Sequence, residues 1–115
     1  MPWVYDPHSG GSKIPTQQHT DICKRVEIYA LARPWHSKIQ LKVRFKGQFC
    51  YIYTLEKRDE EDRLFPLCRL RYLSRGWSMA LFTWSHERYE PCIYPNGQWE
   101  GLIEEALAVC EQLII

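Results

Sequence analysis

The segment from Ile39 to Leu55, IQLKVRFKGQFCYIYTL, constrains the fold more than any other part of the chain. Apolar and polar residues alternate on both sides of a glycine, and such alternation predicts half-buried β-strands. A glycine in a two-residue connection predicts a β-hairpin, so we place the turn at Lys46-Gly47. On the resulting core face, Ile39, Leu41 and Val43 lie opposite Thr54, Ile52 and Cys50.

The other face of this hairpin carries cations and aromatic rings together. The same pairing sets Gln40, Lys42 and Arg44 opposite Tyr53, Tyr51 and Phe49. These polar side chains are not needed to fill a core, so this face is the best functional lead in the sequence.

A second hairpin is predicted further along the chain. Strands are expected from about Phe65 to Leu73 and from about Trp77 to Ser85, joined through Ser74-Arg75-Gly76. Pairing around this connection puts Cys68, Leu70 and Tyr72 with Phe82, Ala80 and Ser78 on one face, and Arg69 and Arg71 with Leu81 and Met79 on the other. The charged segment Glu56 to Arg63, EKRDEEDR, between the hairpins is expected to be a solvated loop.

A helix is expected at each end of this set of strands. From Thr16 to Arg33 the helical spacing is carried by Ile22, Val26, Tyr29, Ala30 and Arg33, and Pro34 ends the helix. From Leu102 to Leu113 an apolar stripe consists of Leu102, Ala106, Val109, Cys110 and Leu113. A short strand is expected from Tyr89 to Tyr94.

The order of these elements predicts one α+β domain over residues 1–115. We expect an antiparallel sheet of four to five strands, made of two hairpins, with the N-terminal and C-terminal helices packed on one face. Residues 1–15 contain prolines and a glycine pair that exclude regular structure. They are expected to form an irregular arm that docks on the domain through Trp3, Val4 and Tyr5.

Composition and charge narrow the classes of function. The chain is 45% hydrophobic and 14% aromatic, which is typical of a folded domain. It has 15 Lys and Arg against 14 Asp and Glu, so any affinity for anions must come from a local patch. It shows no signal-peptide pattern and no apolar run long enough to span a membrane, which predicts a cytoplasmic protein without a membrane partner.

The cysteines are isolated from one another in the sequence. There are five, Cys23, Cys50, Cys68, Cys92 and Cys110, and no two have the spacing of a zinc finger. Their odd number and their places in apolar patterns indicate free thiols in a reducing compartment.

The first candidate site is the face that combines rings and cations. It would gather Lys42, Arg44, Phe49, Tyr51, Tyr53, Arg69, Arg71 and Trp77 if all four strands share one sheet. Exposed rings stack nucleic-acid bases and neighbouring cations bind phosphates. The same composition also suits a protein interface, or a face covered by the arm, the charged loop or a second protomer.

A second candidate site combines Asp6 and His8 with the glycines that follow. They could present metal ligands or an anion-binding backbone nest, or form an ordinary turn in which Asp6 bonds its own backbone. His86 and Glu87 could complete such a metal site, or His86 could activate Cys92 or Cys50. The sequence contains no catalytic motif of known spacing, so we predict no catalytic residue and no cofactor.

Several segments resemble those of a group of small uncharacterised prokaryotic proteins. They are PWVYDPHSGG, FKGQFCYIYT, LCRLRY, SHERYEPC and the EEAL of the closing helix. The resemblance covers most of the chain and implies a soluble, stand-alone bacterial or archaeal domain. It implies no activity, substrate or site.

The sequence therefore favours a small non-enzymatic binding module that binds nucleic acid or a nucleoprotein complex through its basic and aromatic sheet face. The alternative is a protein–protein interaction adaptor or a homodimeric structural protein, because the apolar end Leu113 to Ile115 must close the core or meet a partner. A third reading is a metal-assisted hydrolase built on Asp6, His8, His86 and Glu87.

Overall fold

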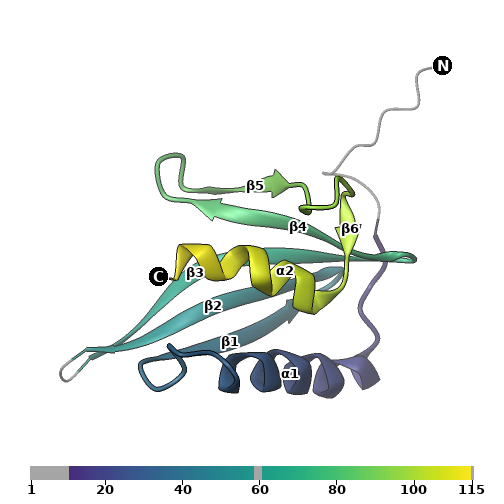
Figure 1. Ribbon diagram of the computed structural model, residues 1–115. Helices are drawn as coiled ribbons and strands as arrows, with labels where there is room; N and C mark the ends of the chain where they lie inside the picture. Colours follow the sequence, from purple (N-terminus) through teal and green to yellow (C-terminus); the bar gives the residue numbers. More distant parts are fainter. Residues whose placement is uncertain (1–10, 59–60, 115) are drawn as a thin grey trace.

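The computed structural model describes residues 11–58 and 61–114 (Figure 1). The expected docking of Trp3, Val4 and Tyr5, and the candidates Asp6 and His8, lie outside the described residues. The elements are α1 (Thr16–Leu31), β1 (Ile39–Lys46), β2 (Phe49–Arg58), β3 (Glu61–Leu73), β4 (Gly76–Thr83), β5 (Arg88–Cys92), β6 (Glu100–Gly101), α2 (Ile103–Cys110) and the short 3₁₀ helix η1 (Glu111–Leu113).

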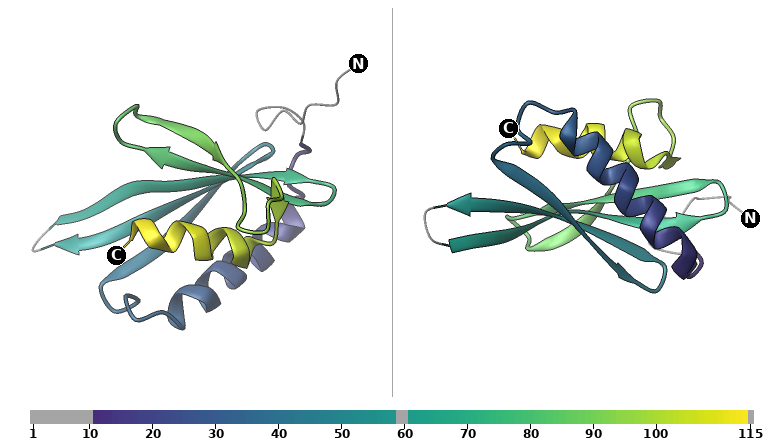
Figure 2. Two further views of the ribbon diagram at one scale, coloured as in Figure 1. Left: turned by 45° about the horizontal axis from the view of Figure 1, so that its top comes forward. Right: turned by 90° about the horizontal axis from the view of Figure 1, so that it is seen from below.

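The strands form one antiparallel sheet in the order β1-β2-β3-β4-β5, and the two-residue strand β6 also pairs with β4. Figures 1 and 2 show α1 and α2 on the same side of this sheet. The prediction of an α+β fold with an open antiparallel sheet is confirmed. In the part of the chain that the structure describes, no helix has the length and apolar character needed to cross a bilayer.

The core lies between the helices and one face of the sheet. The helices contribute Ile22 and Val26 from α1, and Ala106 and Leu107 from α2. The sheet contributes Cys50, Ile52, Cys68, Leu70, Trp77 and Met79. We call this the core face and the opposite side the outer face; neither α1 nor α2 lies over the outer face (Figure 2).

The first hairpin has the predicted faces with a different register. Its turn is Gly47-Gln48, since Lys46 pairs with Phe49, and Gly47 has φ +60°, the positive value that a II′ turn requires at its first central position. Leu41 therefore pairs with Thr54 instead of Ile52. A shift of two residues leaves every side chain on its predicted face.

The second hairpin was predicted in the wrong register. Its connection is only Ser74-Arg75, because Leu73 pairs with Gly76, and a shift of one residue exchanges the faces of β4. Trp77 consequently lies in the core, 6% exposed, and not beside Arg69 and Arg71. Gly76 is a strand residue: a Cβ there would lie 2.9 Å from the carbonyl oxygen of Gly101 in β6.

The predicted charged loop between the hairpins is also wrong, because β2 continues to Arg58 and β3 starts at Glu61. Residues of opposite charge occupy facing positions there, for example Glu56 with Arg63, which favours pairing. This hairpin projects past the C-terminal end of α2 (Figure 1). Further along β3, Leu67 is the extra residue of a β-bulge, since Ile52 pairs with Cys68 and Tyr53 with Pro66.

The closing helix confirms the middle of the predicted apolar stripe and not its ends. Ala106 and Cys110 are buried together with Ile103 and Leu107, and Val109 packs against the core, whereas Leu102 and Leu113 are exposed. Both exposed residues lie outside α2, where helical spacing no longer predicts which way a side chain points. Leu102 has an extended backbone and donates its N–H to the Glu105 carboxylate, 2.9 Å away, as a cap residue does. At the chain end, Ile114 packs against the core.

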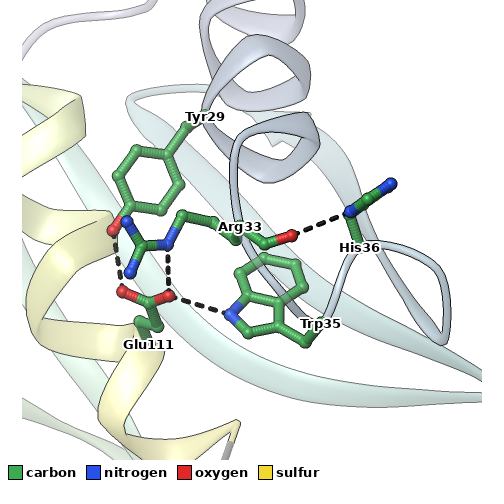
Figure 3. A network of polar contacts seen from close by, with 5 residues as sticks. All are labelled: Tyr29, Arg33, Trp35, His36 and Glu111. Carbon is green, nitrogen blue, oxygen red and sulfur yellow. Dashed lines mark hydrogen bonds and ion pairs between the residues drawn. The ribbon is translucent and has the colours of Figure 1, made fainter.

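A buried carboxylate joins the two helices at one end of the molecule (Figure 3). Glu111 of η1, only 8% exposed, accepts hydrogen bonds from the Tyr29 hydroxyl at 3.1 Å, the Arg33 guanidinium and the Trp35 indole N–H at 2.9 Å. Burial alone would raise the pKa of Glu111, but the hydrogen bonds from Trp35, Arg33 and Tyr29 outweigh it and lower that pKa.

We expect Glu111→Ala to lower the free energy of unfolding by about 2–4 kcal/mol, because it leaves buried donors without their acceptor. Glu104→Ala is the matched control. Glu104 pairs with Arg25, but these side chains are 41% and 35% exposed, so that loss should stay below about 1 kcal/mol. Urea unfolding of both variants measures the difference, and equal losses would contradict the role assigned to Glu111.

The lowered pKa of Glu111 also predicts an acid-dependent contribution to stability. The unfolded chain binds a proton at Glu111 near the ordinary value of 4.5, and the folded chain binds it only at lower pH. The contribution is therefore complete above that value and is lost as pH falls through the folded-state pKa. The stability difference between the wild type and Glu111→Gln should shrink as pH falls from about 6 to about 3. A constant difference in urea unfolding would show that ionisation of Glu111 is not involved.

Candidate functional site

The outer face of the sheet collects cations and aromatic rings from successive strands. β1 contributes Lys42, Arg44 and Lys46, β2 contributes Phe49, Tyr51 and Tyr53, β3 contributes Arg69 and Arg71, β4 contributes Phe82 and β5 contributes Tyr89. All of the predicted site residues except Trp77 therefore share this face. Lys46, Phe82 and Tyr89 are additional members.

The pairing register places rings between cations across three strands. Tyr51 lies between Arg44 on β1 and Arg69 on β3. In the next such row, Phe49 lies between Lys46 and Arg71. Side chains directly opposite on neighbouring strands touch, so each ring is flanked by two positive groups.

The guanidinium groups rest on the rings. The Arg69 guanidinium lies 4.5 Å from the centre of the Phe49 ring and 5.2 Å from that of Tyr89, so it is held between them. The Arg44 guanidinium lies 5.3 Å from the centre of the Tyr53 ring. Cation–π contacts of this kind position both guanidinium groups, and the exposed Arg44 can still offer its other plane for stacking.

The rings also contact one another and form a continuous layer. Tyr89 has its ring centre 5.7 Å from that of Tyr51 and 5.3 Å from that of Phe82, in edge-to-face contacts. Burial is the main cause that raises the pKa of the Tyr89 hydroxyl. The centre of the outer face is thus partly dehydrated, while Lys42, Arg44 and Lys46 at its β1 border are exposed.

Arg71 differs from the other cations of the face because it is buried, 5% exposed. Its guanidinium lies 5.2 Å from the centre of the Phe49 ring. Gly11 lies directly against it, since a Cβ at Gly11 would be 2.9 Å from Cγ of Arg71. The neighbouring Ser12 donates its N–H to the Tyr72 carbonyl at 2.9 Å and keeps this segment in place. Arg71 is therefore covered by the Gly11 segment and is less accessible than Arg69 or the cations of β1.

Charge on the outer face is unbalanced although the chain as a whole is nearly neutral. The cations of this face are Lys42, Arg44 and Lys46 on the edge strand β1 and Arg69 and Arg71 on the central strand β3. Among outer-face positions of the described strands, acidic residues occur at Asp62 and Glu100, near the ends of the sheet. A net charge of +1 then means that most acids lie elsewhere, and the outer face is a local positive patch.

The sequence interpretation missed three residues of this face, Lys46, Phe82 and Tyr89, and it placed Lys46 in the turn of the first hairpin. Phe82 was assigned to the core side because the second turn was taken as one residue too long. Tyr89 was placed in a strand, but its face depends on the register of β4, with which it pairs through Phe82. If the turn is given two residues, Arg69 pairs with Ala80. Alternation from Ala80 then places Phe82 on the outer face, and Tyr89 lies opposite Phe82.

The other sequence candidates do not gather into a site within the described residues. His86 is exposed and its Nδ1 lies 2.7 Å from a carboxylate oxygen of Glu90, a contact that lowers the pKa of Glu90. Cys50 is fully buried, and burial raises its pKa to about 12, so His86 does not activate it. In residues 11–58 and 61–114, no three His, Cys, Asp or Glu side chains are placed to hold a metal ion.

The chain has no significant match among protein-family models, curated proteins or solved structures.

The different surroundings of Arg69 and Arg44 predict different effects on stability. Arg69→Ala should cost about 1–2 kcal/mol, because it removes two partly dehydrated cation–π contacts and the packing of the side-chain stem. Arg44→Ala should cost less than about 0.5 kcal/mol, because Arg44 is exposed. Urea unfolding at neutral pH measures both. A larger loss for Arg44→Ala would contradict the layered arrangement of the outer face.

Proposed function

We propose that the outer face binds single-stranded nucleic acid. The observation that carries the proposal is the set of arginines resting on rings, Arg44 on Tyr53 and Arg69 on Phe49, beside a row of exposed cations on β1. Bases stack on aromatic rings and on guanidinium planes, and lysines neutralise phosphates.

The arrangement divides the contacts between two kinds of residue. Lys42 and Lys46 are exposed at the β1 border and can follow a phosphate backbone. Arg44 and the partly exposed Tyr51 offer flat surfaces to bases, and Arg69 keeps the rings of Phe49 and Tyr89 in position. Stacking of this kind tolerates every base, so we expect little sequence preference.

A single strand fits this face better than a duplex. The rings and guanidinium planes of the outer face can reach bases only where bases are unpaired. The proposed role of the outer face is to hold the strand, without a chemical reaction.

The test is fluorescence anisotropy with a labelled mixed-sequence 12-nucleotide RNA over a range of salt concentrations. If Lys42 and Lys46 each neutralise a phosphate, the plot of log K against log salt should have a slope of about −1.4. The double variant Lys42→Ala/Lys46→Ala should reduce the magnitude of that slope by about 1.4. A duplex of the same length should bind more weakly.

The matched control is Lys24→Ala/Lys38→Ala, which removes the same charge from exposed positions on α1 and in the loop after it. This control should leave the slope almost unchanged. Equal effects of the two double variants would mean that net charge alone drives binding and would refute a site on the outer face. Binding that does not depend on salt would favour the protein-interaction adaptor instead.

A further inference from the structure

The free edge of β1 is a second surface that the proposed function does not use. β1 stands at the end of the strand order and, in the described part of the chain, pairs only with β2. In a two-residue hairpin the closing residues Lys46 and Phe49 form a hydrogen-bonded pair. Alternate residues, Phe45, Val43 and Leu41, then direct their backbone N–H and C=O groups to the open edge.

A groove of about 410 Å³ runs between this edge and α1, the helix nearest to β1 in Figure 1. Its apolar walls include Val26, Ala30 and Leu31 from α1 and Ile39, Leu41 and Val43 from β1. Leu31 is 60% exposed at the rim of the groove. A strand added to β1 would send every second side chain into this groove and cover Leu31.

The charges of β1 define what such a strand can be. Lys42, Arg44 and Lys46 are exposed on the outer face along the same strand. A second copy of β1 paired antiparallel would bring these cations next to one another, which is destabilising. Cations on an edge strand are a known protection against self-pairing. Acidic residues on the added strand, opposite the cations of β1, would instead stabilise the pairing.

We propose that the β1 edge and the adjoining groove bind an extended peptide that adds antiparallel to β1. Residues of this peptide alternate between apolar side chains, which enter the groove, and acidic side chains, which face Lys42 and Arg44. Main-chain hydrogen bonds supply affinity and the alternate side chains supply specificity, as in other cases of strand addition. The peptide and nucleic acid share the cations of β1, so each weakens binding of the other.

The probe is a synthetic seven-residue peptide that alternates Glu and Val, measured by calorimetry and by NMR shifts of the labelled protein. The control peptide has Lys in place of every Glu. The Glu peptide should bind at least about tenfold more tightly at low salt, and amide shifts should concentrate in Ile39–Lys46 and the facing side of α1. Shifts confined to other strands, or equal affinity for both peptides, would overturn the proposal.

Charge reversal tests the contact with Lys42 and Arg44 directly. The variant Lys42→Glu/Arg44→Glu should reverse the preference and bind the Lys peptide more tightly than the Glu peptide. Both residues are exposed, so the variant is expected to fold, and its urea midpoint checks this. An unchanged preference would refute the assigned position of the acidic side chains.

Changes at Cys23 test the groove independently of the outer face, because Cys23 is exposed and lines the groove. Cys23→Trp should fill the groove and weaken peptide binding at least about tenfold, whereas Cys23→Ser should not. Neither change should affect RNA binding at the outer face.

N-methylation of the peptide tests the main-chain hydrogen bonds. Opposite residues in an antiparallel pair share a face, so the Val residues of the peptide lie opposite Leu41 and Val43, whose backbone groups point to the open edge. N-methylation of the Val amides should therefore abolish binding, and N-methylation of the Glu amides should not. Peptide binding that survives both Cys23→Trp and Val N-methylation would overturn the proposal.

Discussion

Apolar contact between the core face of the sheet and both helices is the constraint on which the rest of the structure depends. Ile52 and Leu70 from the sheet meet Val26 of α1 and Leu107 of α2, so one layer of side chains is shared by both helices. Burial of apolar area on this side holds both helices against the sheet, and the outer face is left to its layer of rings and cations. Glu111 fixes the end of this arrangement by accepting hydrogen bonds from α1 and the loop after it.

The outer face is stabilised by its own contacts as well as being available for others. Arg69 is held between two rings and Arg71 lies beneath Gly11, so these cations are partly committed to the fold. The cations of β1 are the exposed ones. The ring layer in the centre is held by these contacts before a ligand is bound, which reduces the entropy lost on binding.

The fold class, both hairpins and the helix positions followed from residue periodicity, because alternation and helical spacing report directly on burial. The faces of the first hairpin survived an error in turn position, since moving a two-residue turn by one residue shifts the register by two. The second hairpin did not, because its turn length was wrong by one. Gly76 was interpreted as a turn residue, but it is a glycine because β6 approaches it closely. No local sequence pattern reveals that approach. The burial of Arg71 was also hidden, because it depends on a segment distant in sequence.

The bulge at Leu67 has a consequence for changes in chain length. Leu67 and Cys68 are neighbours in sequence and both are buried, because the extra residue restores the phase of β3 against β2 on either side of it. Deletion of Leu67 would leave Ile52 opposite Cys68 and Tyr53 opposite Pro66, and every other side chain of β3 would stay on its present face of the sheet. Insertion of one residue between Ser74 and Arg75 in a regular hairpin would instead exchange the two surfaces of β4. Homologous chains of different length should therefore differ inside β3 and keep the following turn intact.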